Sequence, residues 1–198
     1  LRAGTTVRAS VTNAGGEADG ACFHPRLSDD GRHVAFTTFA NNLVVGDGNA
    51  QEDVYVRDLA TPATERVSLS GASSEIAGRS LQPSISADGS VVGFLSVPDA
   101  GGSPLFYERD RAAGTTTLVG VTWDGRPATF AGPNDRVAIS AGNGRFAVFA
   151  TGDGSVVSGD GNSDLPAFGY DVFVRDTGAN SPPVSRIATS WLAGGAPT

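Results

Sequence analysis

Two short sequence patterns occur three times along the 198-residue chain, and this repetition constrains the fold more than any other feature. The first pattern places a serine, a turn of Asp-Gly or Asn-Gly and a phenylalanine in the same order, at 24–36, 82–94 and 137–149. The second pattern follows each copy and ends on Arg-Asp every time, at 53–58, 105–110 and 171–176. Because both patterns recur in the same order, the chain consists of repeated units of one structure.

Each unit is predicted to form four short β-strands. The Asp-Gly and Asn-Gly pairs suit a tight turn between the first two strands, because these residues tolerate positive φ. The valines and aromatic residues of the second pattern favour a third strand. A fourth strand is expected around Val67 and Leu69, at Leu118–Val119 and at Ile187. No long segment has the apolar period of a helix. Phe36, Phe94 and Phe149 are therefore expected to be buried at equivalent places.

Units of four antiparallel strands that recur every 40 to 60 residues or so are typical of β-propeller blades. The sequence predicts an all-β chain with about three four-stranded blades, at 23–80, 81–134 and 135–198. Residues 1–22 are predicted to be the fourth strand and trailing loop of a preceding blade. The basis is that Arg8–Val11 aligns with Arg66–Leu69 at the offset of 58 that relates Pro25 to Pro83.

A propeller ring usually needs at least four blades, so three blades predict a partial ring. Two explanations are open: a piece of a longer protein, or a chain that completes itself with another copy. In the second case the open blade edges would associate, and Val7–Val11 would pair with another chain.

The pattern Ser-x-Asp-Gly-x-x-x-x-Phe followed by Asp-Val-(Tyr/Phe)-Val-Arg-Asp resembles the TolB-like, WD-like β-propeller repeats of bacterial exported proteins. The resemblance covers nearly the whole chain. It implies a propeller fold and an extracellular or periplasmic location, although no signal peptide is present in the chain. Such blades serve in binding, in scaffolding and in a few enzymes.

The charge balance excludes some partners. All 14 basic residues are arginines, 21 residues are acidic, and the formal net charge is −7. An acidic chain is a poor match for a phosphate backbone, so no nucleic acid is expected as a partner. No apolar run approaches the roughly 20 residues of a membrane helix, so membrane insertion is not expected either.

Two long loops, one in the first unit and one in the third, share the sequence Gly-Asp-Gly-Asn and precede a strand that starts with aspartate. Oxygen ligands on such a turn suit Ca²⁺, which takes six to eight of them. The second unit lacks this loop and carries Leu105 where the others carry the strand's aspartate. The predicted ligands form two sets: Asp47, Asn49 and Asp53, and Asp160, Asn162 and Asp171.

A second interpretation of these loops stays open. Asp-Gly-Asn can simply form a turn in which the side chains bond the local backbone. If a metal binds, Glu52 and Asp164 are further candidate ligands.

Two functions from different classes are compatible with the sequence. The first is an exported β-propeller that binds a protein or a carbohydrate or acts as a scaffold, with Ca²⁺ in two blade loops. The second is the propeller portion of an extracellular enzyme, a polysaccharide lyase or a peptidase, whose catalytic residues lie outside this chain. The Arg-Asp pair recurs in every unit, which favours contacts between blades and turn formation over catalysis. No catalytic or cofactor-binding residue is therefore predicted, and the first function is favoured.

Overall fold

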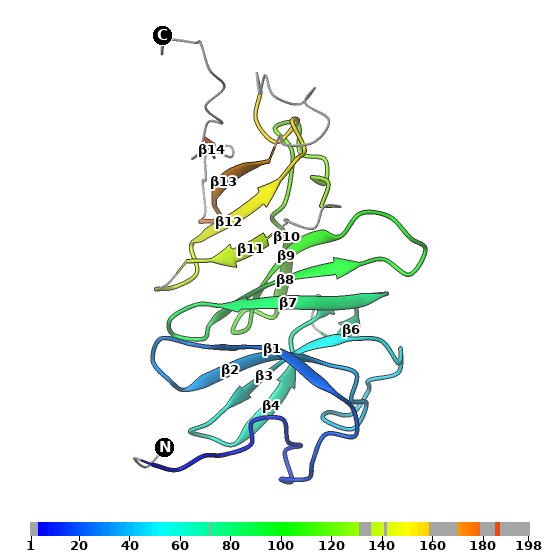
Figure 1. The fold of residues 1–198 in the computed structure, drawn as a ribbon, viewed down its shortest axis with the longest axis vertical. Coiled ribbons are helices and arrows are strands. Elements are labelled where there is room, and N and C mark those ends of the chain that lie inside the picture. The colour runs from blue at the N-terminus through cyan, green and yellow to red at the C-terminus, as the bar shows by residue number, and fades with distance from the viewer. Residues whose placement is uncertain are drawn as a thin grey trace.

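The computed structural model describes residues 4–71, 73–130, 136–140, 142–158, 170–178 and 185–186. These residues form three four-stranded antiparallel sheets and one two-stranded sheet. The larger sheets follow one another along the long axis of the molecule (Figure 1). Among the described residues, no helix is long and apolar enough to cross a membrane. The all-β prediction and the three four-stranded blades are confirmed.

Each large sheet contains four strands that are consecutive in the chain. Blade one consists of β1 (Cys22–Leu27), β2 (His33–Thr38), β3 (Asp53–Asp58) and β4 (Ala63–Arg66). Blade two consists of β7 (Arg79–Ile85), β8 (Val91–Val97), β9 (Leu105–Asp110) and β10 (Thr115–Leu118). Blade three consists of β11 (Arg136–Ile139), β12 (Phe146–Thr151), β13 (Asp171–Asp176) and β14 (Ser185–Arg186). The small sheet pairs β5 (Leu69–Ser70) with β6 (Ser74–Glu75) and follows blade one in the chain.

The fourth strands end earlier than predicted. β4 stops at Arg66, just before the residues on which the sequence centred this strand, and β10 stops at Leu118, the first of the two residues predicted for it. The Val67 amide still donates to the Val54 carbonyl at 2.9 Å, and the Val119 amide does the same to Phe106. The chain then leaves the sheet, because after Val67 it turns into the β5–β6 hairpin.

The first repeated pattern closes a similar turn in all three blades. In blade one the Ser28 hydroxyl accepts a hydrogen bond from the His33 amide at 2.9 Å. The Asp30 carboxylate accepts one from the Arg32 amide, and Gly31 has a φ of 70°. Ser86, Asp88 and Gly89 repeat this arrangement in blade two, and Ser140, Asn143 and Gly144 repeat it in blade three. The turn therefore depends on the serine and the acid or amide as well as on the glycine.

The blades pack face to face. Alternate residues of a strand point to opposite faces of its sheet, and one face of blade one (Ala35, Val54 and Val56) packs against Val92 and Phe94 of blade two. A second cluster joins blades two and three around Phe106, Ile139 and Phe149. Phe36, Phe94 and Phe149 are at most 3% exposed, so their predicted burial is confirmed.

Arginines of the third strands connect consecutive units. Arg57 Nη1 donates to Thr64 Oγ1 at 3.0 Å and to the Thr12 carbonyl at 3.4 Å. Arg109 donates in the same way to Thr116 Oγ1 and to the Gly71 carbonyl. Each arginine thus ties its own fourth strand to the chain that enters from the preceding unit, as its recurrence predicts.

The N-terminal segment differs from the prediction. Instead of a strand at Val7–Val11, the described residues 4–21 form a single bridge between Val11 and Glu17. The segment packs on blade one, where Ala18 covers the cluster of Phe36, Leu43 and Tyr55. A strand needs an adjacent strand edge, and this segment contacts the face of a sheet instead.

A substitution at Gly93 tests the packing between blades two and three. A Cβ at this position would lie 3.0 Å from Ile139 Cγ2 and 2.9 Å from Ser84 Oγ, which accepts the Ile139 amide hydrogen bond. We expect Gly93→Ala to lower the free energy of unfolding by about 1–3 kcal/mol, as overpacked cores do. Urea denaturation measures this change. Gly48→Ala is the matched control, because its Cβ would meet nothing closer than 4.0 Å; equal losses in both variants would contradict the interpretation.

Candidate functional site

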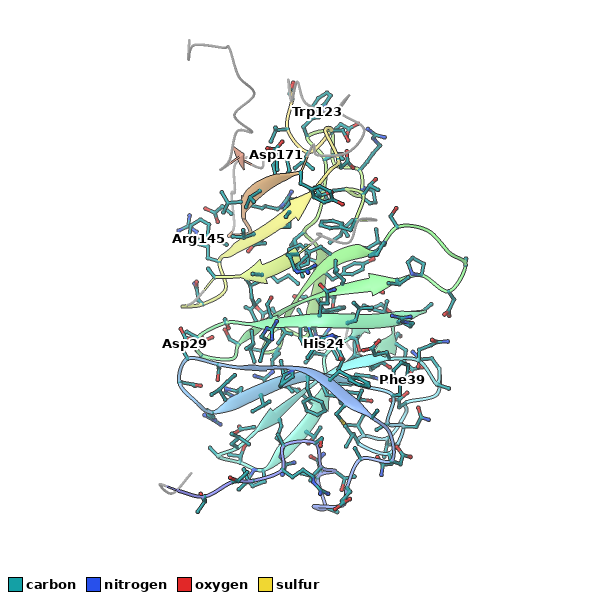
Figure 2. All side chains as sticks on the ribbon, viewed as in Figure 1. His24, Asp29, Phe39, Trp123, Arg145 and Asp171 are labelled. Carbon is teal, nitrogen blue, oxygen red and sulfur yellow. The ribbon has the colours of Figure 1, made fainter. Side chains whose placement is uncertain are left out.

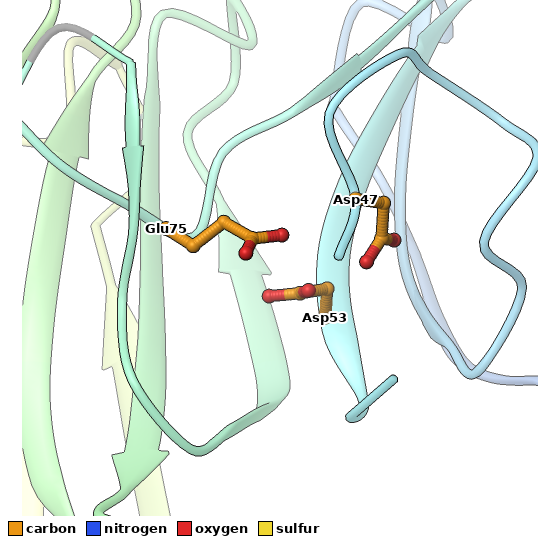
Figure 3. A group of neighbouring side chains, drawn as sticks. All are labelled: Asp47, Asp53 and Glu75. Carbon is orange, nitrogen blue, oxygen red and sulfur yellow. The ribbon is translucent and has the colours of Figure 1, made fainter. Parts of the chain in front are cut away.

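Three carboxylates converge at one end of blade one. Asp53 starts β3, Asp47 lies in the preceding loop, and Glu75 ends β6, so three different segments contribute (Figure 3). One carboxylate oxygen of each residue lies within 4.8 Å of those of the other two. This is the group of acidic side chains that could hold a metal ion among the described residues.

A buried guanidinium lies among these acids. Arg66, the last residue of β4, has a side chain that is 5% exposed, and its Nη1 donates to Glu75 Oε1. The same nitrogen lies 3.4 Å from Asp47 Oδ1 and 3.5 Å from Asp53 Oδ2. Nη2 donates to the Gly46 carbonyl at 2.8 Å. With all three acids ionised, one positive charge faces three negative ones.

Two hydroxyl groups donate hydrogen bonds to the aspartates of the cluster. The Tyr55 hydroxyl donates to Asp47 Oδ2 and the Ser68 hydroxyl donates to Asp53 Oδ1, both at 2.5 Å. The other oxygens, Asp47 Oδ1 and Asp53 Oδ2, are buried and accept no hydrogen bond. Buried charged oxygens without a hydrogen bond are costly, so the cluster has capacity for a further cation or a proton.

The excess negative charge changes the ionisation of the cluster. Burial, with a smaller contribution from Asp47 and Glu75, raises the pKa of Asp53 to about 6. Burial and the hydrogen bond to Asp47 raise the pKa of Tyr55. Burial opposes ionisation of Glu75 as well, but the Gly48 amide and Arg66 outweigh it, and the pKa of Glu75 is lowered. Asp53 is therefore the carboxylate that takes up a proton most readily.

The structure brings together two of the three residues predicted for blade one. Asp47 and Asp53 lie in the cluster, whereas Asn49 Oδ1 accepts a hydrogen bond from the Gln51 amide at 2.8 Å. The side-chain nitrogen Nδ2 of Asn49 is buried without a hydrogen-bond partner. Glu52 lies outside the cluster and has Arg79 Nη2 at 3.6 Å.

In blade three, the structure describes one of the predicted residues. Asp171 is 2% exposed and starts β13 opposite Thr151, as Asp53 starts β3 opposite Thr38 (Figure 2). Asp160, Asn162 and Asp164 lie outside the described residues. The second predicted set therefore stays a prediction.

Sequence reasoning missed Arg66 and Glu75, although the repeat carries a signal for both. Arg8 and Glu17 stand 58 residues earlier with the same spacing, and they too form an ion pair. Val11 bridges Glu17 as Leu69 pairs with Glu75. An arginine and a glutamate that recur together indicate a pair that acts as one unit.

Comparisons with known proteins concern the fold. No protein family and no curated protein matches the chain. Among solved structures, TolB from Acinetobacter baumannii is similar, with 18% identity over 86% of this chain and 33% of that one and a TM-score of 0.48. A putative TolB from Agrobacterium tumefaciens gives 14% identity, 81% and 46% coverage and a TM-score of 0.43.

The β-propeller domain of the trilobed protease from Pyrococcus furiosus gives 11% identity, 84% and 43% coverage and a TM-score of 0.49. The chain spans less than half the length of these three structures.

The ionisation of Asp53 predicts a pH dependence of stability. Because its pKa in the folded protein, about 6, lies above the ordinary 3.8, the folded state binds the proton more readily than the unfolded state. The contribution of Asp53 to the free energy of unfolding therefore falls as the pH rises from 4 to above 6. In a chelating buffer we expect Asp53→Asn to be more stable than wild type at pH 7.5 by about 2 kcal/mol, and equally stable at pH 4.

Urea denaturation at several pH values measures this difference. Asp29→Asn, which replaces an exposed carboxylate at the β1–β2 turn (Figure 2), is the control and should show no such trend. A destabilised Asp53→Asn variant at pH 7.5 would show that Arg66 needs the ionised form.

Proposed function

We propose that the chain is a non-catalytic binding or scaffold module of an exported β-propeller protein. The observation that carries the proposal is what the recurring charged side chains of the chain bind. Arg57 and Arg109 hold successive units together, and Asp58 accepts hydrogen bonds from Arg32 and from the turn at Ala60 and Thr61. Charges that recur with the repeat and bind its own backbone support the assembly of blades.

An activity screen tests the non-catalytic part of the proposal. The purified chain is assayed on chromogenic peptides and on polysaccharides, with release of product as the measurement. No turnover above the rate of a heat-denatured sample is expected. Turnover by the native chain would overturn the non-catalytic proposal.

Ca²⁺ is proposed as the cation of the blade-one cluster. Asp47 Oδ1 and Asp53 Oδ2 are hard oxygen donors without hydrogen bonds, and three carboxylates exceed the charge of Arg66. Arg66 contacts the same oxygens, so it competes with the ion and keeps the affinity modest. Modest affinity suits a module that works outside the cytoplasm, where calcium sites bind with a Kd of about 10⁻⁴–10⁻³ M.

Thermal unfolding tests the calcium proposal. At a Ca²⁺ concentration about 100-fold above Kd, the folded protein gains about 2.7 kcal/mol, which raises Tm by roughly 5–10 °C. Asp47→Asn should reduce this rise in Tm, because it removes the negative charge of one of the two carboxylates that have an oxygen without a hydrogen bond. Arg66→Gln should enlarge it, because it removes the competing cation.

The controls separate calcium binding from general salt effects. Mg²⁺ at equal concentration should have a smaller effect, since it prefers a smaller octahedral site with water ligands. Asp29→Asn should respond to Ca²⁺ as wild type does. A wild-type Tm that Ca²⁺ leaves unchanged would mean that Arg66 alone neutralises the cluster.

The proposed ligand of the module is a protein or a carbohydrate. Trp123 lies on the turn between Thr122 and Arg126 and is 60% exposed, which suits stacking on either kind of ligand.

The proposed periplasmic or extracellular location is supported by the resemblance of the repeats to those of exported proteins. Cell fractionation with an antibody to the chain tests this location.

A further inference from the structure

A groove of about 470 Å³ lies at the junction of blades one and two. Its lining comes from the loop before β3, from β4 and β5, and from β9 with the turn that follows it. Both blades are complete, and no lining residue lies before Val44 or after Gly114, so neither end of the chain lines the groove. Its volume falls within the range of roughly 300–1,000 Å³ that is usual for ligand pockets.

Three arginines from two blades line this groove. Arg66 ends β4, Arg109 belongs to β9, and Arg111 follows β9. Arg66 belongs to the carboxylate cluster of blade one, although its Nε is buried without a hydrogen-bond partner. Glu65 is the acidic residue among the described lining residues. Because the cluster balances Arg66, two further guanidiniums face one carboxylate, in a chain whose net charge is −7.

Arg109 uses one of its three nitrogens to bond the protein. Nη1 donates to the carbonyls of Gly71 and Gly114 and to Thr116 Oγ1, and every hydrogen bond described for this side chain leaves from that atom. Burial lowers the pKa of Arg109, and the nearby carboxylates offset only part of this effect. A guanidinium has five N–H donors, so those on Nε and Nη2 remain for an anion.

Arg111 bonds to the acidic residue of the groove. Its Nε donates to Glu65 Oε1 at 2.5 Å, and its Nη1 donates to the Gly89 carbonyl. The Glu65 side chain is 49% accessible to solvent. An ion pair that reaches solvent contributes little to stability, so a carboxylate from a ligand can take the place of Glu65 on Arg111 at small cost.

The Arg111–Glu65 pair is not part of the repeat. The Arg111 amide donates to the carbonyl of the residue after the turn glycine, and Leu59 and Thr177 make the same bond in the other two blades. Glu65 pairs with β3 at the place where Thr117 pairs with β9. Neither residue of the pair thus has a charged counterpart at these positions. A pair that the repeat does not require indicates a role outside blade assembly.

Aliphatic side chains form another part of the lining. Val45 is fully exposed at the groove, and Val44 and Leu69 are partly buried. Blade three has Ser158 at the position of Val45. The described lining residues include no aromatic side chain on which a sugar ring could stack. Aliphatic side chains beside guanidiniums match a peptide that carries a carboxylate next to an aliphatic residue.

We propose that this groove binds an acidic peptide segment of a protein partner. A carboxylate of the peptide pairs with Arg111 and with the remaining donors of Arg109, and a neighbouring aliphatic side chain packs on Val45. Arginine suits this ligand, since a guanidinium binds a carboxylate through two parallel hydrogen bonds. The inference rests on the proposed function and names the ligand class of the binding module.

Fluorescence anisotropy with a labelled peptide tests the proposal. The probe is an octapeptide of alternating glutamate and valine, and the reference probe has glutamine in place of each glutamate. Salt at about 0.15 M screens the net charge of the chain. The acidic probe is expected to bind at least about 10-fold more tightly than the reference, as the loss of a charge-assisted hydrogen bond predicts. Equal binding of both probes, or binding of neither, would overturn the proposal.

Two substitutions with opposite effects separate ligand binding from a structural role of the ion pair. Arg111→Gln should weaken binding of the acidic probe about 10-fold, because it removes the guanidinium that receives the carboxylate. Glu65→Gln should strengthen binding about 3-fold, because it removes the competing carboxylate. If the pair only held the two blades together, neither substitution would raise the affinity. A Glu65→Gln variant that binds more weakly than wild type would therefore contradict the assigned site.

A third variant and a control locate the binding in the groove. Val45→Glu changes a fully exposed side chain, so it should keep the far-UV circular dichroism of the wild type and weaken binding about 10-fold. Arg26→Gln removes an exposed arginine of β1 that does not line the groove, and it should bind the probe as wild type does. Equal losses in Arg26→Gln and Arg111→Gln would mean that charge attracts the probe without a defined site, and would overturn the proposal.

A carbohydrate competitor distinguishes failure of this inference from failure of the proposed function. Hexagalacturonate carries carboxylates but no aliphatic side chains, so it should displace the acidic probe only at concentrations at least about 10-fold above those of unlabelled peptide. Displacement at equal concentration would overturn the peptide as the ligand, while the chain would remain a binding module. Turnover in the activity screen would overturn the non-catalytic function, whatever the anisotropy shows.

Discussion

Face-to-face packing of apolar sheets is the constraint on which the rest of this structure depends. In blade one the residues of β2 and β3 alternate between two faces, and both faces are apolar. Ala35 and Val54 cover blade two, while Phe36 and Tyr55 are covered by loop residues and the N-terminal segment. A sheet with two apolar faces is stable only when both faces are covered, so each blade requires a covering layer on either side.

The polar bonds between blades serve this packing. Thr64 Oγ1 donates to the Val11 carbonyl at 2.6 Å and Thr116 Oγ1 donates to the Leu69 carbonyl at 2.5 Å. The first carbonyl belongs to the N-terminal segment and the second to β5, and each gains a donor where one unit meets the next. The arginines of the third strands add a second donor at the same junctions. The repeat thus preserves the residues that satisfy the backbone where one unit meets the next.

Features that depend on local sequence could be predicted, and features that depend on tertiary contacts could not. The turns around Gly31 and Gly89 and the burial of Phe36 follow from residue type and spacing. The positive φ of His24 and of Gln82, each at an irregularity of the first strand, shows no local signal because neither residue is a glycine.

The residues of the candidate site likewise divide into those that the sequence predicted and those that it did not. The loop sequence identified Asp47 and Asp53, because a repeated Gly-Asp-Gly-Asn turn and a repeated strand-initial aspartate stand out. Glu75 was not identified, since it enters from the β5–β6 hairpin and its place depends on how that hairpin packs. Asn49 lies in the pattern but its side-chain oxygen binds the loop backbone, which sequence spacing does not reveal.

Blade two lacks the charged cluster of blade one. Leu105 stands at the position of Asp53, Leu118 pairs with Tyr107 as Arg66 pairs with Tyr55, and Pro127 bridges Val121 as Glu75 pairs with Leu69. All three charges are replaced by apolar residues. Removing the guanidinium from a buried ion cluster leaves its carboxylates uncompensated and costs several kcal/mol, whereas replacing every partner is nearly neutral. The cluster of blade one is therefore a single cooperative unit. The charges of Arg66, of the carboxylates and of any added cation or proton must balance one another.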